Sequence, residues 1–582
     1  MKTEWTLDPI YKGLEDPAYE ADMQAVEKLI AEFAKAVKEA GKAEECTEKL
    51  LLLEEELVLK ISRLGLYLSL RQSVEAENGE VMAQDSRLMK MYSQLMPFTA
   101  AADKIFAKIE DIDALAQKSE VVKEYTFLLK QAKENAKYLL SDDVEEIISA
   151  MDMTGGSAWD QLQSFLTSTV KVDYEGKTVT LSEIRNMAYD PDQAVRKAAY
   201  EAELACYEKI QDSIAFALNN IKNQVTFLCH KRGYESPLAM TLKQSRMTKE
   251  TLDAMLEAIK EYLPTFRKYL RKKAEMLGHE NGLPFYELFA PLGKSDKKFG
   301  VEEARDYLVN CFKTFTPDMS DMMQEAFDNE WIDFFPRKGK RGGAFCAGVP
   351  GMKESRILTN YDGNFGAVST LAHELGHAFH NRQTEDNRAL NQDYSMPVAE
   401  TASTFNETHL GHFALTTATP EEKLALLEND LMEKTQCIVD IYSRFLFESA
   451  VFEQSQSKFL MADDLKALML DAQRQAYGEG LDENFLHPYM WACKGHYYSS
   501  GLSFYNFPYA FGNLFAVGLY NMFLEEGESF VPKYKAMLKA TPTCTIEEAG
   551  AMMGVDLSDK KFWESSLALI AKDIEAFCAL IK

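Results

Sequence analysis

Most of this chain repeats apolar residues at three- and four-residue spacing, and this pattern constrains the fold more than any other feature. It is clear from about residue 20 to 145, for example in ADMQAVEKLIAEFAKAVKEA and KLLLLEEELVLKISRLGLYLSL. Positions three and four apart share one face of an α-helix, so such segments bury one face and expose the other. We therefore predict a mainly α protein whose first part forms several long antiparallel helices.

Two short stretches interrupt the helical pattern. TVKVDYEGKTVTLSEI alternates apolar and polar residues on either side of a Glu175-Gly176 turn, which predicts a β-hairpin. The stretch from about 334 to 364 is rich in Gly, Lys and Arg and holds two apolar runs, AFCAG and RILTNY, separated by Pro-Gly. We expect these runs to form two strands, so that a small β element precedes the next helix.

The main domain boundary is predicted near residue 190. Asp190-Pro191-Asp192 follows the hairpin and is typical of the start of a helix with Pro in its first turn. The expected organisation is an N-terminal helical region over 1–114, the remainder of that helical domain with the hairpin over 115–190, and a large C-terminal domain over 191–582.

Charge and cysteine content exclude several classes of protein. The chain carries 64 Lys and Arg against 91 Asp and Glu, a formal net charge of −27, which disfavours nucleic acid or an anionic membrane surface as a partner. No run of about 18 apolar residues predicts a membrane span, and MKTEWTLDPIYKGLEDP lacks the apolar core of a secretory signal. Nine scattered cysteines without a C-x-x-C pair favour a reducing compartment. We therefore expect a cytoplasmic protein.

The segment VSTLAHELGHAFHNRQ contains the pattern H-E-x-x-H. On a helix, His373 and His377 lie one turn apart on the same face, so both imidazoles can bind one metal ion. Glu374 projects about 100° round the helix, close enough to take a proton from water at the metal without being a ligand. Imidazole ligands with an open position for water are typical of catalytic zinc. The alternative is an ordinary helix with two histidines on its polar face.

A third ligand can be sought further along the chain. Gln383 stands where one class of zinc peptidase has its third histidine. His380 lies one turn on along the same helix, where a packing role or a role in supporting a ligand is favoured. Glu385 follows too soon for a returning helix. Glu400 lies in MPVAETASTFNETHLGHF, 23 positions after His377, which leaves room for a loop and an antiparallel helix. The predicted zinc site is His373, His377 and Glu400.

Glu407 lies on the same predicted helical face as Glu400, seven residues later. Zinc-bound histidines usually donate their other ring N–H to a carboxylate or carbonyl, and Glu407 is a candidate for that role towards His373 or His377. A surface glutamate is an equal alternative. For His409 and His412 we expect structural roles.

A late segment, GHYYSSGLSFYNFPYAFGNLF, is rich in groups that could stabilise an oxyanion. It contains His496, and Tyr505 and Tyr509 are four positions apart, so they can face one way on a helix. An aromatic core cluster is the alternative explanation for this segment.

Taken together, these motifs resemble the M3 metallopeptidases, specifically their oligoendopeptidase F branch. HELGHAFH followed by AETASTFNE carries the resemblance, and DPDQAVRKAAYEA, FYNFPYAFG and the ending MMGVDLSDKKFW extend it. It covers most of residues 115–582, whereas the earlier part is similar only in its helical pattern. The resemblance makes 191–582 the catalytic domain.

The resemblance implies a large, helical, two-lobed, zincin-like fold with a deep channel that admits short unfolded peptides. It places His373, His377 and Glu400 on the family's zinc ligands and Glu374 on its catalytic glutamate, with one Zn²⁺ per chain. His496, Tyr505 and Tyr509 fall near the residues that stabilise the transition state.

We predict a zinc-dependent endopeptidase that hydrolyses internal bonds of short peptides, with Glu374 as general base and acid. A helical zinc carboxypeptidase is the alternative, in which Lys340 and Arg341 would bind the substrate carboxylate. A zinc aminopeptidase is disfavoured because no G-x-M-E-N segment precedes the motif. A non-catalytic protein is disfavoured because the base and all three ligands are present. The sequence sets no oligomeric state.

Overall fold

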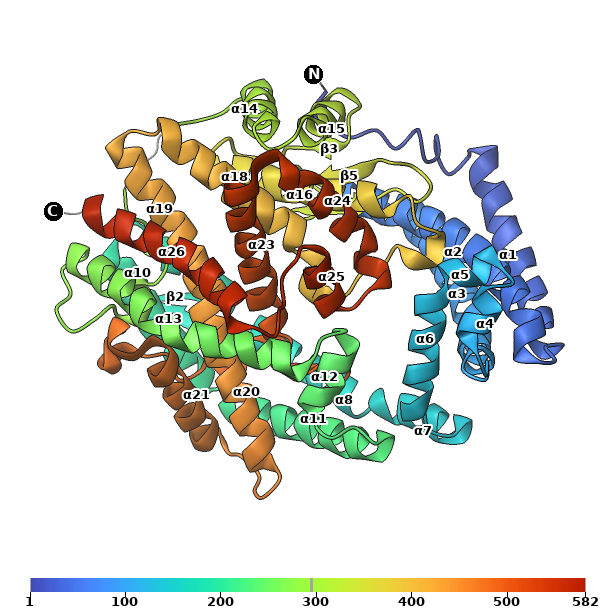
Figure 1. Ribbon diagram of the computed structural model, residues 1–582. Coiled ribbons are helices and arrows are strands. Elements are labelled where there is room, and N and C mark those ends of the chain that lie inside the picture. Colours follow the sequence, from blue (N-terminus) through green and yellow to red (C-terminus); the bar gives the residue numbers. More distant parts are fainter. Residues whose placement is uncertain (1, 294–296, 581–582) are drawn as a thin grey trace.

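The computed structural model describes residues 2–293 and 297–580 (Figure 1). Helices form most of the described chain, and the sheets are small, which confirms the predicted mainly α class. No helix in the described ranges combines the length and apolar character needed to cross a bilayer.

The N-terminal helices pack as a group of their own, at the right of Figure 1. Their apolar faces share one core that runs from Ile10 to Leu129 and includes Val349 as its single buried residue from later in the chain. Short connections join the three long helices, so neighbours run antiparallel, as predicted. The helices are α1 (Pro17–Lys38), α2 (Ala43–Val74), α3 (Gly79–Phe106), α4 (Ile112–Ala116), α5 (Glu120–Glu124) and α6 (Thr126–Asn135).

A second, larger core extends from Val172 to Phe577. The hairpin packs against this second core through Val172, while the domain boundaries at 114 and 190 stay predictions. The next helices along the chain are α7 (Asp142–Asp152), α8 (Gly156–Thr169), α9 (Leu181–Asn186), α10 (Gln193–Glu208), α11 (Gln211–Arg232), α12 (Pro237–Gln244), α13 (Lys249–Met276), α14 (Val301–Lys313) and α15 (Pro317–Asp328).

The remaining helices carry the motifs, and the last of them packs against α13 (Figure 1). They are α16 (Phe365–Thr384), α17 (Met396–Ala399), α18 (Thr401–Thr417), α19 (Pro420–Thr435), α20 (Ile441–Ser455), α21 (Ala462–Tyr477), α22 (Met490–Cys493), α23 (Phe507–Glu526), α24 (Phe530–Ala540), α25 (Ile546–Met552) and α26 (Lys560–Leu580).

The predicted hairpin is present as β1 (Lys171–Tyr174) and β2 (Lys177–Thr180), paired antiparallel. Glu175 and Gly176 both have positive φ, as a tight two-residue hairpin turn requires. The expected helix start at Pro191 is wrong by two residues, because the Asp192 side chain accepts a hydrogen bond from Ala194 N at 2.8 Å and caps α10.

A three-stranded sheet lies beside α16, where the sequence predicted two strands. β4 (Phe345–Gly348) and β5 (Ser355–Leu358) pair antiparallel, as expected. The sequence analysis missed β3 (Ile332–Asp333), which pairs parallel to β5. The order is β3-β5-β4, so β4 is an edge strand. This edge strand contacts α16, which places it next to the H-E-x-x-H motif.

Candidate active site

Helix α16 carries the first two candidate ligands. Its start is fixed by Asn364, whose side chain accepts a hydrogen bond from Ala367 N at 2.8 Å. His373 and His377 lie one turn apart, with ring centroids separated by 4.9 Å. Their side chains are partly exposed, at 25% and 18%, so the face that they share is open to a ligand.

Glu400 joins the two histidines from the next element. It stands at the junction of α17 and α18 rather than inside one continuous helix. Its Oε2 lies 3.3 Å from His373 Nε2 and 3.4 Å from His377 Nε2. Ser403 Oγ donates a hydrogen bond to the same oxygen at 2.8 Å. One ligand atom from each of the three candidate residues lies within 4.8 Å of the others, so a single ion can touch all three.

The charges of this site are strongly coupled. Burial by itself lowers the pKa of His373, but its interactions with Glu400 and Glu407 outweigh burial and raise that pKa to about 11. Burial likewise opposes ionisation of Glu400, yet the two imidazoles hold its pKa well below the usual range. The pair therefore favours an imidazolium beside a carboxylate, and a metal cation would take the place of that proton.

Glu407 contacts the far nitrogen of His373. Its Oε1 lies 3.2 Å from Nδ1, on the side of the ring opposite Glu400. Of the two roles that the sequence left open, this position matches the carboxylate that orients a ligand histidine.

Glu374 is buried, with 6% of its surface exposed. Burial raises its pKa, while His373 and His377 act in the opposite direction. Its carboxylate makes no hydrogen bond or ion pair with any residue in the described ranges. A carboxylate that is buried, unpaired and next to a metal-ligand cluster is suited to exchanging protons.

The other candidates considered for the third ligand are engaged elsewhere. His380 is fully buried, stacks on Tyr394 at 4.0 Å between ring centroids, and lies 2.8 Å from Thr541 Oγ1 through Nε2. Glu385 accepts a hydrogen bond from Gly351 N at 2.7 Å. The surroundings of His380 match the packing role favoured from the sequence, and Glu385, disfavoured there as a ligand, contacts the backbone of the loop after β4.

His409 and His412 also lie in packed surroundings on α18. His409 Nε2 is 3.0 Å from Thr314 Oγ1. His412 stacks on Tyr520 with 5.1 Å between ring centroids, and its Nε2 lies 3.9 Å from Asp573 Oδ2.

The structure brings His496, Tyr505 and Tyr509 together. The ring of His496 lies 5.1 Å from that of Tyr505 and 5.9 Å from that of Tyr509, and the two tyrosine rings are 5.6 Å apart. They do not share one helix, because Tyr505 precedes the start of α23. Burial raises the pKa of Tyr509, and Tyr505 and Glu400 raise it further, so its hydroxyl remains a donor at neutral pH.

Helix α23 also contacts the element that carries Glu400. A Cβ added to Gly512 would lie 3.3 Å from both Pro397 O and Glu400 Cβ. Because Tyr509 is one turn before Gly512 on α23, the aromatic cluster stands beside the candidate metal site.

The sequence analysis missed two residues that hold α16 and α18 together. A Cβ on Gly376 would lie 2.5 Å from Ala402 O, so the two backbones approach too closely for any other residue. Asn406 is buried and donates a side-chain hydrogen bond to Ala372 O at 2.9 Å. Two features of the sequence could have pointed to these residues: a glycine inside the H-E-x-x-H helix and an asparagine next to Glu407.

Comparison with known proteins identifies the family. The sequence model described as Peptidase family M3 matches residues 186–569, and the model described as Oligopeptidase F matches residues 107–171. Oligopeptidase PepF of Bacillus subtilis is 24% identical over 98% of this chain and 86% of its own length. An oligoendopeptidase F homolog of Lactococcus lactis is 24% identical over 100% of this chain and 98% of its own length.

Solved structures share the fold. A Chlamydophila abortus protein superposes with a TM-score of 0.87 at 20% identity and covers 100% of this chain and 98% of that one. Oligoendopeptidase F from Enterococcus faecium superposes with a TM-score of 0.69 at 18% identity, over 97% of this chain and 99% of that one. The chain belongs to peptidase family M3. The predicted enzyme class, a metallo-endopeptidase, is confirmed at the level of the family.

Proposed function

We propose that this protein is a zinc-dependent oligoendopeptidase that hydrolyses internal bonds of short, unfolded peptides. The observation that carries the proposal is the convergence of His373, His377 and Glu400 within 4.8 Å, with the unpaired carboxylate of Glu374 beside them.

The donor set fits zinc. Two imidazole nitrogens and one carboxylate oxygen are the ligands of a common class of catalytic zinc site, which keeps a fourth position open. The contact between Glu407 and His373 Nδ1 supports the same assignment, because it fixes the ring so that Nε2 faces the metal position. We assign one zinc ion per chain to His373, His377 and Glu400.

Zinc bound there supplies a Lewis acid that makes water more acidic and polarises a peptide carbonyl. Glu374 takes the proton of the attacking water and later delivers it to the leaving amine. The hydroxyls of Tyr505 and Tyr509 and a ring nitrogen of His496 donate hydrogen bonds to the oxyanion that develops on the substrate.

The edge strand β4 gives a binding mode for an extended peptide. Within the described residues, β4 pairs only with β5, so its other edge can accept a further strand. Cys346 of β4 is close enough to Glu374 for that carboxylate to raise the pKa of the thiol, after the larger effect of burial. A peptide paired with β4 would therefore pass the proposed general base.

The carboxypeptidase alternative loses one of its two suggested cations. Lys340 is fully buried, and its Nζ lies 2.6 Å from Asp333 Oδ1. Arg341 places its guanidinium over the ring of Phe345. An ammonium already paired with a buried carboxylate does not bind the C-terminus of a substrate, so Arg341 alone would have to do so in a carboxypeptidase, and this weakens that alternative.

The test is mass spectrometry of the products formed from a mixed library of short peptides. Wild-type protein is incubated as purified, with a chelator, and with zinc restored. The proposal expects internal fragments that disappear with chelator and return with zinc. A ladder of products shortened one residue at a time would instead support the carboxypeptidase, and cleavage that persists in chelator would overturn the zinc assignment.

We also propose a cytoplasmic location. All nine cysteines are free in the structure, which supports the reducing compartment predicted from their spacing.

A further inference from the structure

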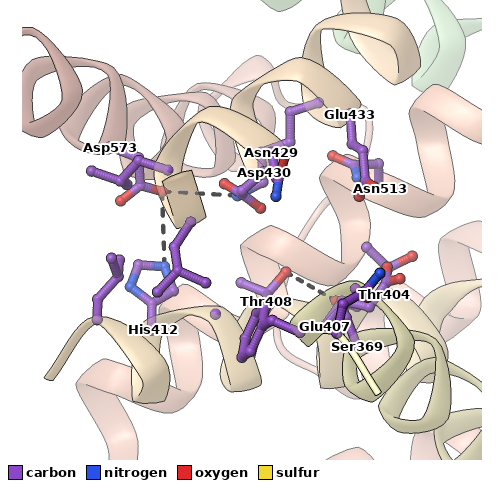
Figure 2. Close-up of a pocket in the computed structure, with 18 of the residues that line it drawn as sticks. Ser369, Thr404, Glu407, Thr408, His412, Asn429, Asp430, Glu433, Asn513 and Asp573 are labelled. Atoms are coloured by element: carbon purple, nitrogen blue, oxygen red, sulfur yellow. Dashed lines mark hydrogen bonds and ion pairs between the residues drawn. The ribbon is translucent and has the colours of Figure 1, made fainter. Parts of the chain in front are cut away.

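An acidic cavity of about 480 Å³ is lined in part by Glu407, the residue that contacts His373 (Figure 2). Side chains from α16, α18, α19, α23 and α26 line it, so it forms where segments far apart in the sequence meet. Tyr189, Asn364 and Glu433 line the cavity and are exposed, which shows that it opens to solvent. Its volume is in the range of pockets that bind small ligands.

The lining combines apolar walls with an excess of carboxylates. Phe365, Leu415, Leu426 and Leu427 supply apolar surface. Lys434 is the only lysine or arginine among the lining residues, all of which lie in the described ranges. Four acidic residues line the same cavity: Glu407, Asp430, Glu433 and Asp573.

The single lysine does not neutralise these carboxylates. Lys434 Nζ lies 2.6 Å from Asp430 Oδ2 and 3.8 Å from Asp573 Oδ2. His412 adds no charge at neutral pH, because burial and Lys434 lower its pKa to about 4. The carboxylate of Glu433 makes no hydrogen bond or ion pair with any described residue. The cavity therefore holds more negative than positive charge.

Asp573 is an independent sign that a ligand group is missing. Asp573 is 8% exposed, yet its carboxylate accepts no hydrogen bond from the described residues. Its Oδ2 lies 3.8 Å from Lys434 Nζ and 3.9 Å from the uncharged His412 Nε2. Burial raises its pKa to about 6, so it is ionised at neutral pH. Buried charges are normally paired and hydrogen-bonded.

Glu433 and Asn513 also line the cavity, and both are labelled in Figure 2. Asn513 Oδ1 is buried without a hydrogen-bond partner. Loss of hydration on burial raises the pKa of Glu433, and the negative charges of Glu407 and Asp430 raise it further, to about 7. A donor that carries positive charge would satisfy both oxygen groups.

We propose that this cavity is a substrate subsite that binds the basic side chain, arginine or lysine, of a peptide residue close to the scissile bond. The apolar walls fit the aliphatic stem, and the carboxylates fit the guanidinium or ammonium group. The inference rests on the proposed function, since it needs a peptide held at the zinc site.

The position of Glu407 links the subsite to the chemistry. One carboxylate contacts His373 at 3.2 Å and also lines the cavity. An extended peptide advances about 3.3–3.6 Å per residue, so a side chain that reaches the cavity belongs to a residue within a few positions of the cleaved bond.

The test compares peptides that are N-acetylated and C-amidated, so that neither terminus carries charge. The cleavage site of one peptide is mapped first. For each position near that site, a pair of peptides is made that carries either arginine or its neutral analogue citrulline, and kcat/KM is measured for both members of the pair. We expect zinc-loaded wild type to prefer arginine at one position by about twofold to fivefold, which is the upper part of the range measured for exposed charge pairs. Glu433→Gln should reduce this ratio, and Glu433→Lys should bring it below one.

Glu421→Gln is the matched control, because Glu421 is an exposed glutamate on the same helix and lies outside the cavity. It should keep the wild-type ratio. Equal cleavage of arginine and citrulline peptides at every position, or an unchanged ratio in both Glu433 variants, would overturn the subsite alone. Failure of zinc-loaded wild type to cleave any peptide would overturn the proposed function itself, and the subsite with it.

Discussion

Glu407 Oε1 lies 3.2 Å from His373 Nδ1, while Nε2 of the same ring lies 3.3 Å from Glu400 Oε2. One imidazole is thus held between two carboxylates. The arrangement fixes both the orientation of the ring and the nitrogen that faces the proposed metal, so the third carboxylate of the site, Glu374, can act on water rather than support the ligands.

Removing the Glu407 carboxylate should weaken zinc binding. Glu407→Gln leaves His373 without the carboxylate at Nδ1, and we expect about 10- to 100-fold lower zinc affinity. Competition with a fluorescent chelator measures it. Glu421→Gln, on an exposed part of α19, should bind zinc like wild type. Wild-type affinity in Glu407→Gln would show that the contact does not support the ligand.

The backbones of α16 and α18 lie too close together at Gly376 for a methyl group to fit between them. In Gly376→Ala, the Cβ would meet Ala402 O at 2.5 Å, and we expect a loss of about 1–3 kcal/mol in unfolding free energy together with weaker zinc binding. Chemical denaturation of the chelated and zinc-loaded protein measures both effects.

Gly411→Ala is the control for this substitution, because Gly411 lies on α18 and an added Cβ would meet nothing within 4 Å. It should be neutral or slightly stabilising. Equal stability of both variants would contradict the tight contact.

The aromatic cluster should act on the chemical step. Tyr505→Phe, Tyr509→Phe and His496→Ala each remove a donor, and the substitution that removes the true oxyanion donor should lower kcat by about 10²–10³-fold with a smaller change in KM. Steady-state kinetics on one peptide separates the two parameters. Wild-type kcat in all three variants would assign the cluster to packing, the alternative that the sequence left open.

Acid should destabilise the protein partly through His409. Burial lowers the pKa of His409 from 6.5 to about 4, so between these values the unfolded chain binds a proton that the folded chain does not. Its contribution to stability is therefore present above pH 6.5 and is lost as pH falls towards 4.

His409→Gln should consequently lose less thermal stability than wild type between pH 7 and pH 5. Calorimetry in the presence of chelator measures the difference without a contribution from zinc release. His230→Gln, at an exposed position of α11, should follow wild type. Parallel loss of Tm in His409→Gln and wild type would contradict the effect.

Local patterns predicted the helices, the hairpin and the shared face of His373 and His377, because each depends on residues near in sequence. Glu400 was proposed from the room for a loop and a returning helix, and it lies within 4.8 Å of the two histidines. The sequence analysis missed β3, whose two residues are too short a run to recognise and pair with a strand more than 20 positions later. It also suggested a surface role for Lys340, which is buried against Asp333. The acidic cavity could not be found at all, since Glu407, Glu433 and Asp573 come together only after α18, α19 and α26 have packed.

The central claim is that Glu374 transfers protons at a zinc ion bound by His373, His377 and Glu400. Glu374→Gln removes the base and keeps the size of the side chain, so turnover of a cleaved peptide should fall by about 10²–10⁴-fold or more. The decisive measurement is kcat in this variant together with its zinc content by atomic absorption. The account predicts nearly complete loss of turnover with one zinc still bound per chain, and normal turnover with zinc bound would contradict it.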